Sequence, residues 1–212
     1  MSPYEWGLLV VGISLQSMVL SAMLKGYIRS YPFIFSYIIV NLLSTVVQFS
    51  TKHYYGARSR EFAQAYWISD FAGHAMMLMI IIQLIRVAME KHNNRDMVYW
   101  GLLSGAAVIG MVSFLRLQGL SAQPIPRWIT QIGRDYYFSA VILNLILWVA
   151  LVRVNHPNKQ LYLLTSGLGL QLSGAAVAHA LRMAGREYWF VANLFLVTTY
   201  LANLIVWYVA LK

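Results

Sequence analysis

The sequence predicts an all-α integral membrane protein, a polytopic bundle of seven transmembrane helices. Apolar residues make up 59% of the 212 residues and charged residues only 11%, whereas soluble domains contain about 25% charged residues. A soluble fold of this composition would expose too much apolar surface to stay dispersed. The apolar residues also fall into seven long runs. Each run can cross a bilayer, because a helix needs about 20 residues to span a hydrocarbon core of about 30 Å.

The breaks between the runs contain the glycine, proline and polar residues typical of loops. The expected transmembrane spans are 5–24, 32–51, 63–86, 97–116, 128–152, 160–181 and 188–210. The connections are too short for a soluble domain, so a single transmembrane domain is expected over 1–212. Residues 1–6 include Glu5 but no lysine or arginine. The first span is therefore expected to be a permanent helix and not a cleaved signal peptide.

The placement of charge predicts where the protein lies and how it is oriented. No lysine or arginine precedes the first span, whereas Lys25 and Arg29 follow it. The positive-inside rule then places the N-terminus outside and the C-terminus in the cytoplasm. The short, aromatic-rich loops are typical of small multi-pass proteins of the bacterial inner membrane. The net charge of +9 comes mostly from single basic residues at run ends, so the lipid bilayer is an expected partner and nucleic acid is not.

The candidate site consists of ionisable residues inside the apolar runs. A charge near the bilayer centre costs about 2.5–3.5 kcal/mol even on the lenient insertion scales, so each such residue needs an explanation. Asp70 and His74 are four residues apart, which places them on one helix face where they can pair. Counted inward from the loops, the candidates all fall in the half of the bundle on the N-terminal side. They are Asp70, His74, Arg134, Asp135, His179 and Arg182.

These residues support a leading functional hypothesis and one bland alternative. The leading hypothesis is a transporter-like membrane protein that binds or transports a small polar or charged solute through a pocket lined by the six residues. This interpretation favours a protein that is not an enzyme. The alternative is a non-catalytic accessory subunit, bound to a membrane-protein partner or to a second copy of itself. In that case the polar residues satisfy one another and specify helix packing.

A metal-dependent intramembrane hydrolase is a further alternative. Asp70, His74 and His179, with Asp135 nearby in the same half, offer the oxygen and nitrogen ligands that zinc accepts. This donor set resembles that of the intramembrane zinc hydrolases of the alkaline ceramidase and adiponectin-receptor type, which also have seven helices. Their His-x-x-x-His pair is absent from this sequence. A haem between His74 and His179 is another cofactor hypothesis, and the leading hypothesis needs neither cofactor.

Two further patterns concern packing. Small residues, including Gly101, Gly105, Gly167 and Gly174, are frequent in 97–116 and 160–181. They predict closely packed interior helices, since small residues let backbones approach in a membrane. The segment 35–42 is similar to 138–145, and the Asn-Leu-Ile-x-Trp of 144–148 recurs at 203–207. The first similarity is consistent with an inverted repeat of the kind found in transporters.

Overall fold

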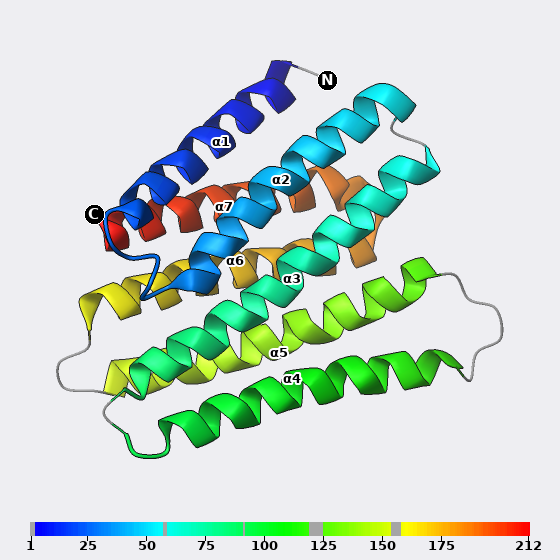
Figure 1. Ribbon diagram of the computed structural model, residues 1–212. Coiled ribbons are helices and arrows are strands. Elements are labelled where there is room, and N and C mark those ends of the chain that lie inside the picture. The colour runs from blue at the N-terminus through cyan, green and yellow to red at the C-terminus, as the bar shows by residue number, and fades with distance from the viewer. Residues whose placement is uncertain (1–2, 57–58, 91, 119–124, 154–157) are drawn as a thin grey trace. The chain divides into compact units, whose positions relative to one another are not determined.

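The computed structural model is all-helical over the residues that it describes, which confirms the predicted fold class (Figure 1). It describes the chain except for residues 1–2, 57–58, 91, 119–124 and 154–157. Side chains are also left undescribed at 3–5, 113–114, 116–118, 125–134, 153, 179, 182–183 and 186. The helices are α1 (Pro3–Leu24), α2 (Pro32–Tyr55), α3 (Arg60–Ala88), α4 (Arg95–Gln118), α5 (Ile125–Arg153), α6 (Lys159–Ala184), the short η1 (Arg186–Tyr188) and α7 (Trp189–Leu211).

Six helices contain stretches that are long and apolar enough to cross a membrane. These stretches are Trp6–Leu24, Pro32–Tyr55, Arg60–Ala88, Asp135–Val152, Lys159–Ala178 and Trp189–Leu211. By length and composition the chain is therefore a multi-pass membrane protein. The remaining predicted span, 97–116, is helical throughout as part of α4 but is not among the six. Several side chains in its second half lie outside the described residues.

The helices group into two compact units. Unit 1 contains residues 1–30 and 141–212, which comprise α1, the second half of α5, α6 and α7. Unit 2 contains residues 31–140, which comprise α2, α3, α4 and the first half of α5. The single domain over 1–212 stays a prediction, as does the repeat of 35–42 at 138–145, because its two copies belong largely to different units.

In unit 1, α6 and α7 pack along their whole length. Trp207 is fully buried, and its indole N–H donates to the Leu164 carbonyl at 3.0 Å. One turn away, the amide of Asn203 donates to Gln171 Oε1 at 2.6 Å. Small residues on α6 make room for these side chains: a Cβ on Gly167 would lie only 2.7 Å from Asn203 Oδ1. Buried polar groups therefore set the register of the two helices.

The copy of the Asn-Leu-Ile-x-Trp pattern on α5, at 144–148, also contacts α6. On α5, the indole N–H of Trp148 donates to Ser166 Oγ at 3.3 Å. A Cβ on Gly169 would lie 2.7 Å from the amide nitrogen of Asn144. The recurring pattern thus corresponds to a similar packing role in α5 and α7, with an asparagine beside a glycine of α6 and an indole donor one turn on.

In unit 2, the core lies between α2 and α3. Ile34, Tyr37 and Ile38 of α2 are buried, as are the α3 residues from Ile80 to Leu84. The N-terminus of α2 begins with Pro32, which lacks an N–H, and the next free N–H, of Phe33, donates to Gln83 Oε1 at 3.2 Å. Gln83 is only 7% exposed. A polar residue within the apolar stretch of α3 is thereby explained as a cap for a neighbouring helix.

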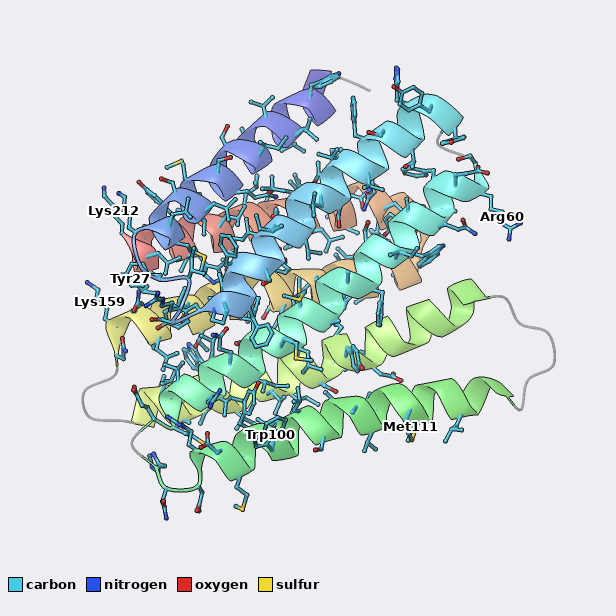
Figure 2. All side chains as sticks on the ribbon, in the orientation of Figure 1. Tyr27, Arg60, Trp100, Met111, Lys159 and Lys212 are labelled. Atoms are coloured by element: carbon cyan, nitrogen blue, oxygen red, sulfur yellow. The ribbon has the colours of Figure 1, made fainter. Side chains whose placement is uncertain are left out.

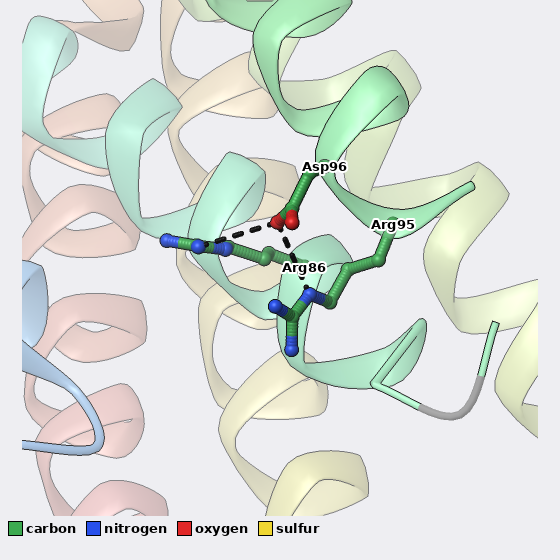
Figure 3. A network of polar contacts seen from close by, with 3 residues as sticks. All are labelled: Arg86, Arg95 and Asp96. Atoms are coloured by element: carbon green, nitrogen blue, oxygen red, sulfur yellow. Dashed lines mark hydrogen bonds and ion pairs between the residues drawn. The ribbon is translucent and has the colours of Figure 1, made fainter. Parts of the chain in front are cut away.

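The turn from α3 to α4 is joined by charged side chains (Figure 3). Asp96 Oδ1 accepts from Arg95 Nε at 3.2 Å and from Arg86 Nη2 at 3.3 Å. The Arg86 guanidinium also lies 4.6 Å from the centre of the Tyr99 ring. The hydrogen bond from Arg95 and the charges of both arginines hold the pKa of Asp96 below its usual value. These groups are exposed to solvent, so their ion pairs contribute little to the stability of the fold.

Candidate functional site

The candidate site in unit 2 is built around the pair of Asp70 and His74 on α3. Their side chains lie on one face, as the four-residue spacing predicts, with Nδ1 of His74 3.5 Å from Oδ2 of Asp70. That distance is longer than the 2.7–2.9 Å or so of a strong charge-assisted hydrogen bond. The His74 side chain is 12% exposed and that of Asp70 is 41% exposed. The carboxylate is therefore open while the imidazole lies behind it.

The buried imidazole nitrogen is left without a hydrogen bond. Among the described residues, His74 Nδ1 has no hydrogen-bond partner. Leaving a buried polar atom unsatisfied costs about 1–3 kcal/mol, so such atoms in a folded protein call for a specific explanation. The Asp70 carboxylate lies 3.5 Å from this atom but forms no hydrogen bond with it.

Two aromatic side chains of α5, Tyr136 and Tyr137, contact α3 beside the pair. The Tyr137 ring meets His74 edge to face, with ring centres 5.4 Å apart, and Tyr136 stacks on Phe71 at 6.2 Å. Tyr137 is buried. These aromatic residues are not among the site residues predicted from the sequence. A signal for them existed, because Tyr136 and Tyr137 directly follow Asp135, and Phe71 lies next to Asp70.

The other predicted site residues are placed less fully. Asp135 is half-buried at the start of the membrane-spanning stretch of α5, two residues before Tyr137. The side chains of Arg134, His179 and Arg182 lie outside the described residues. His179 and Arg182 belong to unit 1, whereas the other four belong to unit 2. The structure thus brings together Asp70 and His74 and adds Tyr137, and the remainder of the six-residue site stays a prediction.

The metal hypotheses also stay predictions. Among the described side chains, no three of the histidine, aspartate and glutamate residues gather where they could hold one metal ion. Both the zinc and the haem hypotheses depend on His179, whose side chain lies outside the described residues.

The chemistry of the described part of the site favours hydrogen-bond donors. An ionised carboxylate accepts hydrogen bonds only, and a neutral imidazole offers one acceptor nitrogen. The faces of the neighbouring aromatic rings attract cations through their quadrupoles. A second carboxylate, Asp135, lies on α5 directly before Tyr136 and Tyr137. The arrangement therefore suits a group that donates hydrogen bonds or carries positive charge.

A second set of buried polar groups lies in unit 1 and was largely missed by the sequence analysis. Besides Asn203 and Gln171, it includes Gln16, whose amide donates to the Tyr200 hydroxyl and thereby ties α1 to α7. Neutral amides and hydroxyls carry no charge, so the placement of charge in the apolar runs gives no signal for Gln16, Gln171 and Tyr200. Their bonds cross between helices, so we interpret them as packing contacts.

Comparison of the chain with protein-family models, with curated proteins and with solved structures finds no match.

Proposed function

We propose that this membrane protein binds a small polar solute, one that donates hydrogen bonds or carries a positive charge, at the Asp70–His74 pair. The observation that supports the proposal most directly is the buried Nδ1 of His74, which forms no hydrogen bond with the described residues and lies 3.5 Å from the open carboxylate of Asp70. A solute at this position would reach the Asp70 carboxylate and the His74 imidazole, and it would lie close to the ring of Tyr137. In a transporter-like protein this pair would be the binding site along the path of the solute.

We further infer that the protein lies in a bacterial inner membrane with its N-terminus outside. The lysine and arginine that follow the first span, Lys25 and Arg29, support this orientation. A green fluorescent protein fused after Lys212 is then expected to fluoresce, since it folds in the cytoplasm. Alkaline phosphatase activity from the same fusion site would contradict the orientation.

Thermal unfolding of the purified protein in detergent tests the solute site. The panel should contain alkali and divalent cations, primary and quaternary amines, neutral polar solutes and small anions. A solute present at 100 times its Kd stabilises the folded state by about 2.7 kcal/mol. For a chain of this size the midpoint rises by about 5–10 °C. We expect a cation or a hydrogen-bond donor to give this shift.

Matched variants separate the site from general effects. Asp70→Asn and His74→Ala should remove the stabilisation, whereas His53→Ala and Asp96→Asn, which change exposed residues elsewhere, should retain it. Stabilisation that persists in both site variants would remove these residues from the site. Stabilisation by zinc alone, lost with His179→Ala, would favour the hydrolase alternative. No shift with any solute would favour the accessory-subunit alternative over the proposal.

A further inference from the structure

A pocket of about 300 Å³ lies between α1 and α7 in unit 1, away from the Asp70–His74 pair on the chain. Figure 1 shows these two helices side by side, and their last turns lie at the same end of the unit. The pocket is at this end, where both helices finish. Its polar lining consists of Ser17, Ser21, Lys25, Tyr208 and Lys212.

The polar lining residues follow the helical repeat on both walls. Ser17, Ser21 and Lys25 succeed one another at intervals of four, which places them in one row along α1. Tyr208 and Lys212 are likewise four residues apart on α7 and its C-cap. All five side chains carry hydrogen-bond donors. Two rows of donors thus face the same space.

These donors are not used within the described protein. None of the five side chains has a hydrogen-bond or ion-pair partner among the residues that the structure describes. Other hydroxyls in these helices do have one: Ser14 donates to the Val10 carbonyl at 2.8 Å, and Thr199 donates to the Phe195 carbonyl at 2.7 Å. The hydroxyls in the pocket are therefore available to a ligand.

The charged side chains that line the pocket are both positive. Two lysines line the pocket. The only acidic residues in the sequence of unit 1 are Glu5, near the start of α1, and Glu187, just before α7. The pocket lies at the other end of both helices. The two helix C-termini oppose an anion with about half a negative charge each. The two lysine ammonium groups carry two positive charges against this contribution. Figure 2 shows Lys159 at the same end of unit 1 as Lys212, so a third cation lies in this region.

The pocket also sits at a suitable depth for a lipid. Lys25 and Lys212 directly follow the apolar stretches Trp6–Leu24 and Trp189–Leu211, so both lie at the level of the headgroups. Ser21 and Ser17 lie about 6 and 12 Å further along α1, because a helix rises about 1.5 Å per residue. Met18 and Leu211 add apolar surface to the lining. The charged end suits a phosphate, and the deeper part suits the glycerol and acyl region.

We propose that this pocket binds an anionic phosphate group, and that the group is the headgroup of an anionic phospholipid. Lys25 and Lys212 hold the phosphate at the membrane surface. Ser21 and Tyr208 donate hydrogen bonds to its oxygens or to those of the adjoining glycerol. A free phosphate ion offers the same chemistry at the lysines but leaves the apolar and deeper hydroxyl contacts unused.

Native mass spectrometry of the detergent-purified protein, with the tag at the N-terminus, tests the proposal. Phosphatidylglycerol, phosphatidylcholine and inorganic phosphate are titrated in separate arms. We expect phosphatidylglycerol to bind most tightly. The double variant Lys25→Gln with Lys212→Gln should weaken its binding about 25-fold, since each basic residue near anionic headgroups contributes about fivefold.

Three further variants define the outcome. Lys52→Gln with Arg60→Gln removes two positive charges from unit 2 and should leave phosphatidylglycerol binding unchanged. Lys25→Arg with Lys212→Arg should retain binding, and Ser21→Leu should weaken binding by filling the pocket while both charges remain. Thermal midpoints without lipid show that each variant is folded.

Phosphate binding as tight as that of phosphatidylglycerol, and lost in the lysine variant, would support the phosphate site and identify free phosphate as its ligand. Equal binding of phosphatidylcholine would overturn the proposal. Unchanged phosphatidylglycerol binding in the folded lysine variant would overturn it as well.

Discussion

Gly174 provides the sharpest test of the packing between α6 and α7. A Cβ built on Gly174 would lie 2.5 Å from Cβ of Thr199 and would overlap its Oγ1 and Cγ2 atoms. Carbon atoms pack best at about 3.5–4.0 Å. The Thr199 Cβ is bonded directly to the backbone, so no change of rotamer relieves the overlap. Gly174→Ala therefore forces the two helices apart.

The magnitude follows from two opposing effects. Overpacking of a core costs up to about 3 kcal/mol, and such a short Cβ–Cβ distance calls for the upper end of the range. Alanine favours a helix over glycine by about 1 kcal/mol. The net loss is about 2 kcal/mol, which lowers the midpoint of thermal unfolding by about 4–8 °C in a chain of this length. The assay is thermal unfolding in detergent, followed by tryptophan fluorescence.

Gly105→Ala is the matched control for this prediction. Gly105 lies on α4, and a Cβ there would meet nothing within 4 Å. The substitution should leave stability unchanged or raise it by up to about 1 kcal/mol. Adding Thr199→Gly to Gly174→Ala should restore part of the loss, with a coupling energy of about 1 kcal/mol or more. Equal midpoints for the two alanine variants, or no coupling to Thr199, would refute the reasoning.

Three further predictions concern hydrogen bonds and charge. Asn203→Leu should lower the free energy of unfolding by about 1–3 kcal/mol, because it removes the hydrogen bond that Asn203 donates to Gln171 Oε1. In chemical unfolding, the double variant with Gln171→Leu should lose less stability than the sum of the two single variants. Gln83→Leu should lower the thermal midpoint by removing the acceptor for the first turn of α2, a loss of about 1 kcal/mol, whereas Gln64→Leu on the exposed face of α3 should not. The pKa of Asp96 is lower in the folded state than its ordinary value of 3.8, so the ionised carboxylate stabilises the fold above that pH. This contribution is lost as the pH falls through the pKa of the folded state. The difference in midpoint between the wild type and Asp96→Asn should therefore be small at pH 6 and should shrink as the pH falls below about 3.8. A difference that grows on acidification would contradict the assignment.

The glycines show where sequence reasoning stops. The sequence analysis predicted that the small residues of both 97–116 and 160–181 let helices approach closely. On α6 this is confirmed, since Cβ atoms on Gly167 and Gly174 would overlap side chains of α7. On α4, Gly101 and Gly105 are exposed, and a Cβ on either would meet none of the described residues within 4 Å, so the close approach predicted for these two stays a prediction. Composition within a helix does not show which face meets a neighbour.

Part of the candidate site could likewise be predicted from the sequence, and part of it could not. The four-residue spacing of Asp70 and His74 is a local property of one helix, so the sequence sufficed to predict their proximity. The approach of Tyr137 to His74 joins residues on different helices, and no periodicity in either helix predicts it. The pocket at Lys25 and Lys212 likewise joins α1 to α7, which are separated by most of the chain.

The sequence by itself determined the class of protein and the approximate positions of its helices. The six expected spans that are not in α4 overlap the six apolar membrane-spanning stretches, because the length and apolarity of a run are local properties that a bilayer selects directly. Only the tertiary structure decided which polar groups are paired, which glycines are packed and where two rows of donors face each other. Those contacts depend on the orientation of each helix about its axis, and that orientation is set by packing between residues that are distant in the sequence.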